Sequence, residues 1–252
     1  MSNAINPEHY NRLNPQPKDV IRAWGLNFNL GSAVRRVYMK IVDAGYEILD
    51  TLNGEEILKK IERVARVCYK SEDKITEGSA EKMVRALIKS NHMAMLEHYS
   101  FSVKFICDRG VSHEIVRHRV ASYAQESTRY CNYNKSGDVA FIRPVFFAED
   151  TPEMDNWVES CMRAEKTYNY LISEGRTPQE ARSVLPNSLK TEVVMTANLR
   201  EWRHFLSLRA CGSTGKPHPQ MLEVAVPLLK ELRERVPVVF DDLEPMELET
   251  VK

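Results

Sequence analysis

The stretch "YSFSVKFI", residues 99–106, alternates between apolar and polar side chains along its whole length. Tyr99, Phe101, Val103 and Phe105 occupy one set of positions, and two serines and a lysine occupy the other. Because successive side chains of a strand point to opposite faces, this pattern predicts a strand that is buried on one face only. The stretch "LKTEVVMTA", residues 189–197, is also strand-like.

Helical patterns surround these two strands. After Asn53-Gly54, the stretch "EEILKKIERVARVCY" predicts an amphipathic helix. We expect Ser79 to cap a helix over residues 80–91, and Ser112 to cap one over residues 113–120. The first of these three helices is expected to bury one stripe of side chains, namely Ile57, Ile61, Val64, Ala65 and Cys68.

The second half of the chain carries clear helix starts. Thr151-Pro152-Glu153 begins a helix that is expected to run to Gly175, and Thr177-Pro178 begins a short helix that ends before Pro186. Asn198 is expected to cap a helix over residues 199–210, and Pro227 to kink a last helix over residues 219–236. Helices and strands alternate without a regular βαβ repeat, so we predict an α+β fold with an antiparallel-rich sheet.

The beginning of the chain differs from the rest. Residues 1–38 contain several prolines and little periodicity, whereas "MKIVDAGYEIL", residues 39–49, starts with a methionine and reads as one strand. We therefore expect residues 1–38 to be an appended segment and residues 39–252 to form one domain. No apolar run approaches the length of a membrane span, and the start lacks a signal-peptide pattern. The five cysteines show no C-x-x-C spacing, so free thiols in the cytoplasm are expected.

The stretch "RHRVASYAQESTRY", residues 117–130, gathers three arginines, a histidine and three serine or threonine hydroxyls. One interpretation is a solvated charged surface, and the other is a pocket for a ligand with several negative charges. The formal net charge of the chain is zero, which argues against a general nucleic-acid binder. Arg182, Arg200 and Arg209 add further cations in apolar or capped contexts. Surface ion pairs would explain any one of them, but together they favour a nucleotide or phosphate ligand.

Other chemistries fit less well. In "HEIVRH", His113 and His118 are five residues apart, about 140° around a helix, so they cannot act as the paired ligands of a zinc hydrolase. Cys131 and Ser127 lie in no recognised nucleophile motif. The segment "CGSTGKPHPQ", residues 211–220, lacks the spacing of a phosphate-binding P-loop. We expect no bound metal.

The stretch 117–130 also resembles the signature of the flavin-dependent thymidylate synthase family. Arg117, His118 and Arg119 are followed after seven residues by Ser127, and the fit continues through Arg129. "SNHMAMLEHYSFSV", "EARSVLP", "TANLREWRHFLSLRA" and "HPQ" resemble other segments of that family, in the same order over residues 39–240. Residues 1–38 weakly resemble a phage-associated domain of unknown function.

The resemblance implies an activity. Members of the family make dTMP from dUMP, with methylenetetrahydrofolate as carbon donor, FAD as the source of the hydride and NADPH as the usual reductant. They are homotetramers with active sites shared between subunits. The resemblance also implies roles for individual residues. The nucleotide would be bound by Glu114, Arg117, Gln125, Glu126, Ser127, Thr128, Arg129, Arg182 and Arg209, and FAD by His92, Arg117, His118, Arg119, Gln125, Asn198, Arg200 and His204.

Arg209 is the expected catalytic residue, because a fixed positive charge at the uracil favours ionised N3. Several positions depart from the family pattern. Ala94, Glu114 and His204 stand where a hydroxyl residue, a glutamine and an asparagine are common, and Gln125 replaces a common glutamate. The Gln125-Glu126 pair leaves open which of the two side chains faces the ligand. A nucleotide- and FAD-binding protein with altered catalysis is the alternative function.

Overall fold

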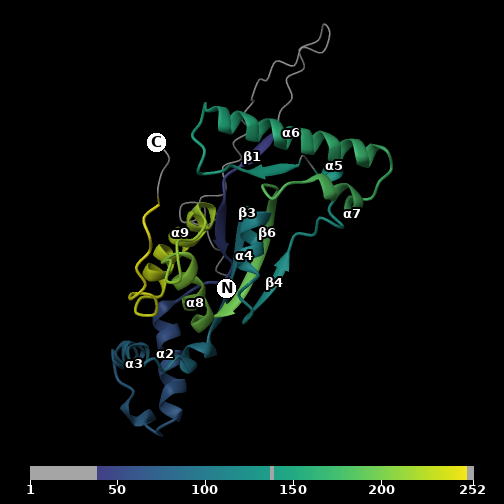
Figure 1. The fold of residues 1–252 in the computed structure, drawn as a ribbon. Coiled ribbons are helices and arrows are strands. Elements are labelled where there is room, and N and C mark those ends of the chain that lie inside the picture. Colours follow the sequence, from purple (N-terminus) through teal and green to yellow (C-terminus); the bar gives the residue numbers. More distant parts are fainter. Residues whose placement is uncertain (1–38, 137–138, 249–252) are drawn as a thin grey trace, which may run out of the picture.

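A computed structural model describes residues 39–136 and 139–248 (Figure 1). Its centre is a four-stranded antiparallel sheet in the order β2-β3-β6-β4. The two predicted strands are the central pair, and they pair along their full length, from Ser100 opposite Asn198 to Asp108 opposite Lys190. The strands span β2 Gly45–Ile48, β3 Ser100–Asp108, β4 Ala121–Gln125 and β6 Lys190–Asn198. The predicted α+β class is confirmed.

Helices cover one face of this sheet and form the main core. On that face, the ring of Trp202 stacks on Phe101 with ring centroids 4.9 Å apart, and its Nε1 donates to the backbone oxygen of Phe101. The opposite face is polar, with Ser102 bonded to Thr196 and Lys104 paired with Glu47. The elements that form this core are α2 Gly54–Val67, α3 Ser79–Lys89, η2 Met93–His98, α4 Arg109–Ile115, α8 Leu199–Arg209 and α9 Pro219–Arg235.

A second, smaller core lies beside the sheet. There β1 pairs in parallel with β5, and the long helix α6 lies beside them (Figure 1). The ring of Tyr168 on α6 is buried in this core. This part comprises β1 Lys40–Val42, α5 Tyr133–Ser136, β5 Ala140–Ile142, α6 Pro152–Ser173, α7 Pro178–Ala181 and η3 Arg182–Val184. A further short turn, η1, spans Glu72–Lys74. None of the helices within the described ranges is both long and apolar enough to cross a bilayer.

Residues 39–49 form two strands rather than the predicted single one. β1 ends at Val42 and β2 begins at Gly45, and the two strands belong to different sheets. The prediction was wrong because Asp43 and Ala44 between the strands let the chain leave one sheet and join another, which the residue pattern alone does not reveal. The predicted appended segment, residues 1–38, lies outside the described residues.

Two predicted helix caps were also wrong. Gly78 holds the N-cap position of α3, while the hydroxyl of Ser79 donates to Glu62 (2.9 Å). Asp108 caps α4 by accepting from the backbone of Val111, and Ser112 lies inside that helix. In both cases the structure places the cap before the serine.

Other details of the helices match the sequence more closely. Thr151 and Asn198 cap α6 and α8 as predicted, and α6 ends at Ser173, two residues before Gly175. Pro227 lies inside α9, which continues to Arg235. Cys68 is exposed, and Leu58 is buried in α2 instead.

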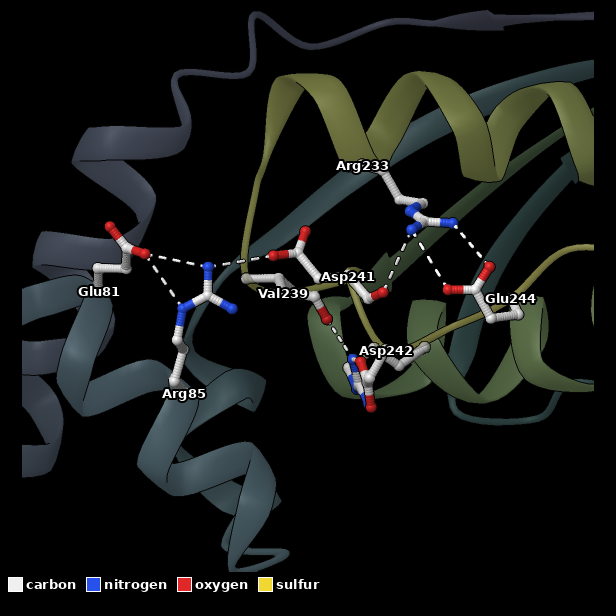
Figure 2. A network of polar contacts seen from close by, with 8 residues as sticks. Glu81, Arg85, Arg233, Val239, Asp241, Asp242 and Glu244 are labelled. Carbon is white, nitrogen blue, oxygen red and sulfur yellow. Dashed lines mark hydrogen bonds and ion pairs between the residues drawn. The ribbon is translucent and has the colours of Figure 1, made fainter.

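The segment after α9, residues 236–248, is fastened by arginines from three helices (Figure 2). Arg203 of α8 donates through both Nη atoms to Asp242 (2.7 Å each) and also to the backbone oxygen of Val239. Arg233 of α9 reaches Glu244 at 3.4 Å, and Arg85 of α3 pairs with Asp241 at 3.3 Å. These contacts connect the segment to the helices that cover the sheet.

Candidate active site

Arg209 ends α8 and is held by groups at the end of α4. Its Nη1 donates to the carboxylate of Glu114 (2.8 Å), and its Nη2 donates to the backbone oxygen of the same residue (3.3 Å). Its Nε donates to Nε2 of His118 (3.2 Å). The structure therefore brings together Glu114 and Arg209, which were predicted to bind the nucleotide, and His118, which was predicted to bind FAD.

The bonding of His118 fixes its protonation. A guanidinium can only donate hydrogen bonds, so Nε2 of His118 must be the acceptor, and the neutral ring carries its hydrogen on Nδ1. Burial, together with the nearby charges of Arg209 and His204, lowers the pKa of His118 to about 4. The imidazole is therefore neutral near pH 7 and keeps accepting from Arg209.

Nδ1 of His118 is a buried donor without a hydrogen-bond partner among the described residues. It faces the carboxylate of Glu201 at 3.5 Å, and the ring of His204 lies 5.5 Å away between centroids. His118, Glu201 and His204 are residue types that bind zinc, and their ligand atoms lie within 4.8 Å of one another. A metal ion at Nδ1 would need a free lone pair on that nitrogen. Because Nε2 accepts from Arg209, Nδ1 carries the hydrogen instead, so this hydrogen bonding disfavours a metal ion.

The turn between α4 and β4 is fixed by Tyr123. Its hydroxyl lies 2.5 Å from the backbone oxygen of His118 and 3.0 Å from that of Ile115. These contacts hold the "RHR" segment against the sheet. Arg117 and Arg119 of that segment are exposed.

A second group of predicted residues gathers where β4 ends. Arg182, at the start of η3, donates from Nη1 to the buried hydroxyl of Thr128 (3.0 Å). The hydroxyl of Ser127 accepts from the backbone of Arg129 (3.3 Å), and the guanidinium of Arg129 lies over the ring of Tyr130 at 5.4 Å. Residues 127–129 and Arg182 thus meet within one chain.

Neither Gln125 nor Glu126 is left without a partner. The amide of Gln125 donates to Ser112 on α4 (2.9 Å). The carboxylate of Glu126 accepts from the hydroxyl of Tyr133 (2.6 Å) and from Lys190 (3.3 Å). The carboxylate charge of Glu126 is therefore compensated by a lysine within the fold.

Four arginines on this side of the protein have no carboxylate partner. Every one of them is exposed, and none makes an ion pair within residues 39–136 and 139–248. Among the other described arginines, Arg143 and Arg203 pair with carboxylates, whereas Arg63 and Arg176 are also exposed and without an ion pair. The four unpaired cations are Arg117, Arg119, Arg129 and Arg182.

The remaining predicted cofactor residues surround the start of α8. The side chain of Asn198 accepts from the backbone of Glu201 (2.9 Å) and so serves as the cap. Arg200 is exposed and pairs with Glu97 of η2 (2.6 Å). His92 is exposed at the beginning of η2, and His204 is exposed on α8. Asn198, Arg200 and His204 therefore lie on the α8 side, with His118, rather than at the loop after β4.

The sequence did not indicate several partners of the site. Tyr133, Lys190 and Glu97 were missed because their contacts depend on the tertiary fold. Glu201 had a local signal, since it stands three residues after the capping Asn198. Glu114 also lines a pocket of about 280 Å³. The pocket's other lining residues include Asp108, Phe146, Trp157, His218 and Gln220.

The fold and the site define an α+β protein that presents unpaired arginines, with neutral histidine and hydroxyl groups, for an anionic ligand. The chain belongs to the thymidylate synthase complementing protein family, which matches residues 47–238. A flavin-dependent thymidylate synthase from Pyrococcus furiosus is 32% identical over 177 residues, covering 69% of each chain. One from Corynebacterium aurimucosum is 34% identical over 202 residues, covering 72% of this chain and 78% of its own.

A solved structure shares the fold as well. The UMP/dUMP methylase PolB from Streptomyces cacaoi, bound with 5-Br dUMP, superposes with a TM-score of 0.66 at 26% identity. The match covers 79% of this chain and 93% of that protein. Sequence and structure comparisons therefore agree with the resemblance inferred from the motif.

Proposed function

We propose that this protein converts dUMP to dTMP by reductive methylation. 5,10-Methylenetetrahydrofolate is the carbon donor, FAD the bound cofactor and NADPH the reductant. The observation that carries the proposal is the set of four exposed arginines without carboxylate partners. They lie near the two ends of β4, in a chain of zero net charge. Guanidinium groups bind phosphate in a bidentate manner and stay charged at any working pH.

The residues present fit a flavin with a diphosphate. Arg117 and Arg119 offer exposed, unpaired guanidinium groups, and Nδ1 of His118 offers a buried donor that lacks an acceptor. Asn198, Arg200, His204 and His92 are the further residues that would hold it. FAD supplies the hydride when it is bound. The protein's part is to hold and orient the cofactor next to the nucleotide.

The nucleotide residues divide between two tasks. Ser127, Thr128, Arg129 and Arg182 supply hydroxyl and guanidinium donors for the phosphate. Arg209 places its positive charge at the uracil ring, where it favours the ionised form of N3 and so activates the ring. The neutral state of His118 supports this role, because it lets Arg209 donate to the imidazole and keeps a second cation away from it.

The proposal has a direct test. The purified protein should be yellow, heat should release FAD, and dUMP with methylenetetrahydrofolate and NADPH should give dTMP. A colourless protein that cannot take up FAD would exclude the proposal. A yellow protein that binds dUMP but forms no dTMP would identify a binding protein with altered catalysis instead.

A further inference from the structure

The carboxylate of Glu114 holds a special position in this site. It pairs with Arg209 at 2.8 Å, and the backbone oxygen of Glu114 accepts from the same guanidinium. Glu201, the other nearby carboxylate, faces His118. Within the described residues, Glu114 is thus the acidic group that is ion-paired to Arg209. The other arginines proposed to bind the nucleotide have no such partner.

The ion pair is open enough for a ligand to reach it. The side chain of Arg209 is 22% exposed and that of Glu114 is 35% exposed. Because the two side chains are paired at 2.8 Å, a ligand that binds at Arg209 meets the carboxylate at the same place, in surroundings where charges are less screened than in bulk water.

The consequence is electrostatic. A negative group that approaches Arg209 gains attraction from the guanidinium and loses most of it to repulsion by a carboxylate at nearly the same distance. Ionisation of a ring next to Arg209 is opposed in the same way, because a like charge disfavours the charged form. Orientation of Arg209 depends less on this carboxylate, since His118 and the backbone oxygen also hold the guanidinium.

We infer that Glu114 is an internal counter-ion of Arg209 and that an anionic pyrimidine nucleotide binds in competition with it. Glu114 thereby sets the affinity of the site for the nucleotide. The inference rests on the proposed function for the identity of the ligand. It assigns to Glu114 an effect opposite to that of a residue that helps to bind the nucleotide.

The test compares two neutral variants with one that keeps the charge. Glu114→Gln retains the size and an acceptor oxygen, Glu114→Ala removes the side chain, and Glu114→Asp retains the carboxylate. For the holoenzyme we expect both neutral variants to bind dUMP about five-fold more tightly in calorimetry, the scale of a partly exposed ion pair. The KM for dUMP should fall in parallel, and Glu114→Asp, which keeps the charge, should tighten binding less than either neutral variant.

Glu159→Gln is the matched control. Glu159 also pairs with an arginine, Arg163 on α6, and its side chain is 35% exposed, as in Glu114. Its loss should leave dUMP affinity unchanged, which separates the local effect from the change in net charge. In an Arg209→Ala background, the effect of Glu114→Gln on dUMP affinity should differ from its effect in the wild type, because the two side chains are directly paired and their effects are coupled.

The outcomes distinguish the inference about Glu114 from the proposed function. If dUMP binds but the neutral variants bind it equally or more weakly, Glu114 is not a counter-ion and the inference is overturned while the proposed function stands. An effect of Glu114→Gln that is the same with and without Arg209 would overturn the inference too. A wild-type holoenzyme that binds no dUMP would overturn the proposed function and the inference together.

Discussion

Ser127 shows how the neighbours of a residue decide its role. It ends the motif that begins at Arg117, in the position where a nucleophile would be sought. Its hydroxyl accepts from the backbone of Arg129, and among the described residues it makes no hydrogen bond to a histidine or a carboxylate. A serine without a base is a weak nucleophile, whereas a hydroxyl beside an unpaired arginine is suited to donate to phosphate.

We predict that Ser127→Ala weakens dUMP binding and leaves turnover. The loss of one hydrogen bond of about 1 kcal/mol should raise the KM for dUMP roughly five-fold, while kcat at saturating dUMP stays within about two-fold. Ser122→Ala, an exposed serine on β4, is the control and should change neither value. Abolished turnover with unchanged dUMP affinity would contradict a binding role.

His118 has a consequence for stability, because its pKa of about 4 lies below that of a free histidine. Between pH 6.5 and 4 the unfolded chain takes up this proton and the folded chain does not, so the free energy of unfolding decreases as the pH falls. The contribution is fully present above the unfolded pKa. By itself it amounts to at most about 3 kcal/mol.

We predict that His118→Gln flattens this part of the pH profile. The difference in unfolding free energy between wild type and variant, measured by urea denaturation of the FAD-free protein, should shrink by about 1–3 kcal/mol from pH 7 to pH 4.5. Taking the difference cancels the contributions of other titrating groups. One of these is Glu223, whose burial raises its pKa to about 7, so that its contribution to stability changes with pH in the opposite sense. Profiles that stay parallel would show that His118 is not buried in its neutral form.

At the level of elements, the sequence predicted what local rules determine. Alternation identified β3, the strand-like stretch 189–197 identified β6, and Asn198 identified the start of α8. The wrong predictions concern features that depend on contacts between distant segments. Ser79 was expected to cap α3, but Glu62 of α2 takes its hydroxyl.

The site divides in the same way. Its arginines and hydroxyls stood out in the sequence, whereas the bond between Arg209 and Glu114 joins residues 95 positions apart. Nothing in the local pattern of either segment specifies that distance. The partner of Glu126, Lys190, is likewise brought to it by the pairing of β4 with β6.

Gly54 marks a close contact between two helices. A Cβ atom at this position of α2 would lie 2.5 Å from the backbone oxygen of Arg235 and 3.0 Å from Cδ of Pro237. The first turn of α2 can therefore pack against the end of α9 only because residue 54 has no side chain.

We predict that Gly54→Ala destabilises the fold by about 1–3 kcal/mol through overpacking. This outweighs the higher helix propensity of alanine, which favours an isolated helix over glycine by about 1 kcal/mol. Urea denaturation would measure the change. Gly45→Ala is the control, since a Cβ there would meet nothing within 4 Å, and it should be neutral or slightly stabilising. A stabilised Gly54→Ala protein would mean that helix propensity outweighs the contact.

At the level of the whole molecule, the proposed nucleotide- and cofactor-binding residues form two groups that lie apart within one chain. Arg209, Glu114 and His118 lie near the beginning of β4, and residues 127–129 with Arg182 lie beyond its end. A strand of this length spans about 13 Å. The homotetramer that the family resemblance implies predicts that the two groups that meet one dUMP come from different chains.

Mixed assemblies test this arrangement. Arg209→Ala and Arg129→Ala should each be inactive alone, because each removes one half of every shared site. When the two variants are unfolded and refolded together, mixed tetramers contain sites with both arginines, so part of the turnover should return. Mixed tetramers without any recovered turnover would place both arginines on one chain.

The fastening of residues 236–248 has a consequence for synthesis on the ribosome. Arg203 and Arg209 belong to the same helix, α8, which the ribosome completes before it makes Asp242, the partner of Arg203. A nascent chain that has reached only α9 therefore carries the residues of the site on a helix that still lacks this anchor. A premature stop codon shortly after α9 would leave the whole signature motif intact. It would remove Asp242, which anchors Arg203 on the helix that also carries Arg209.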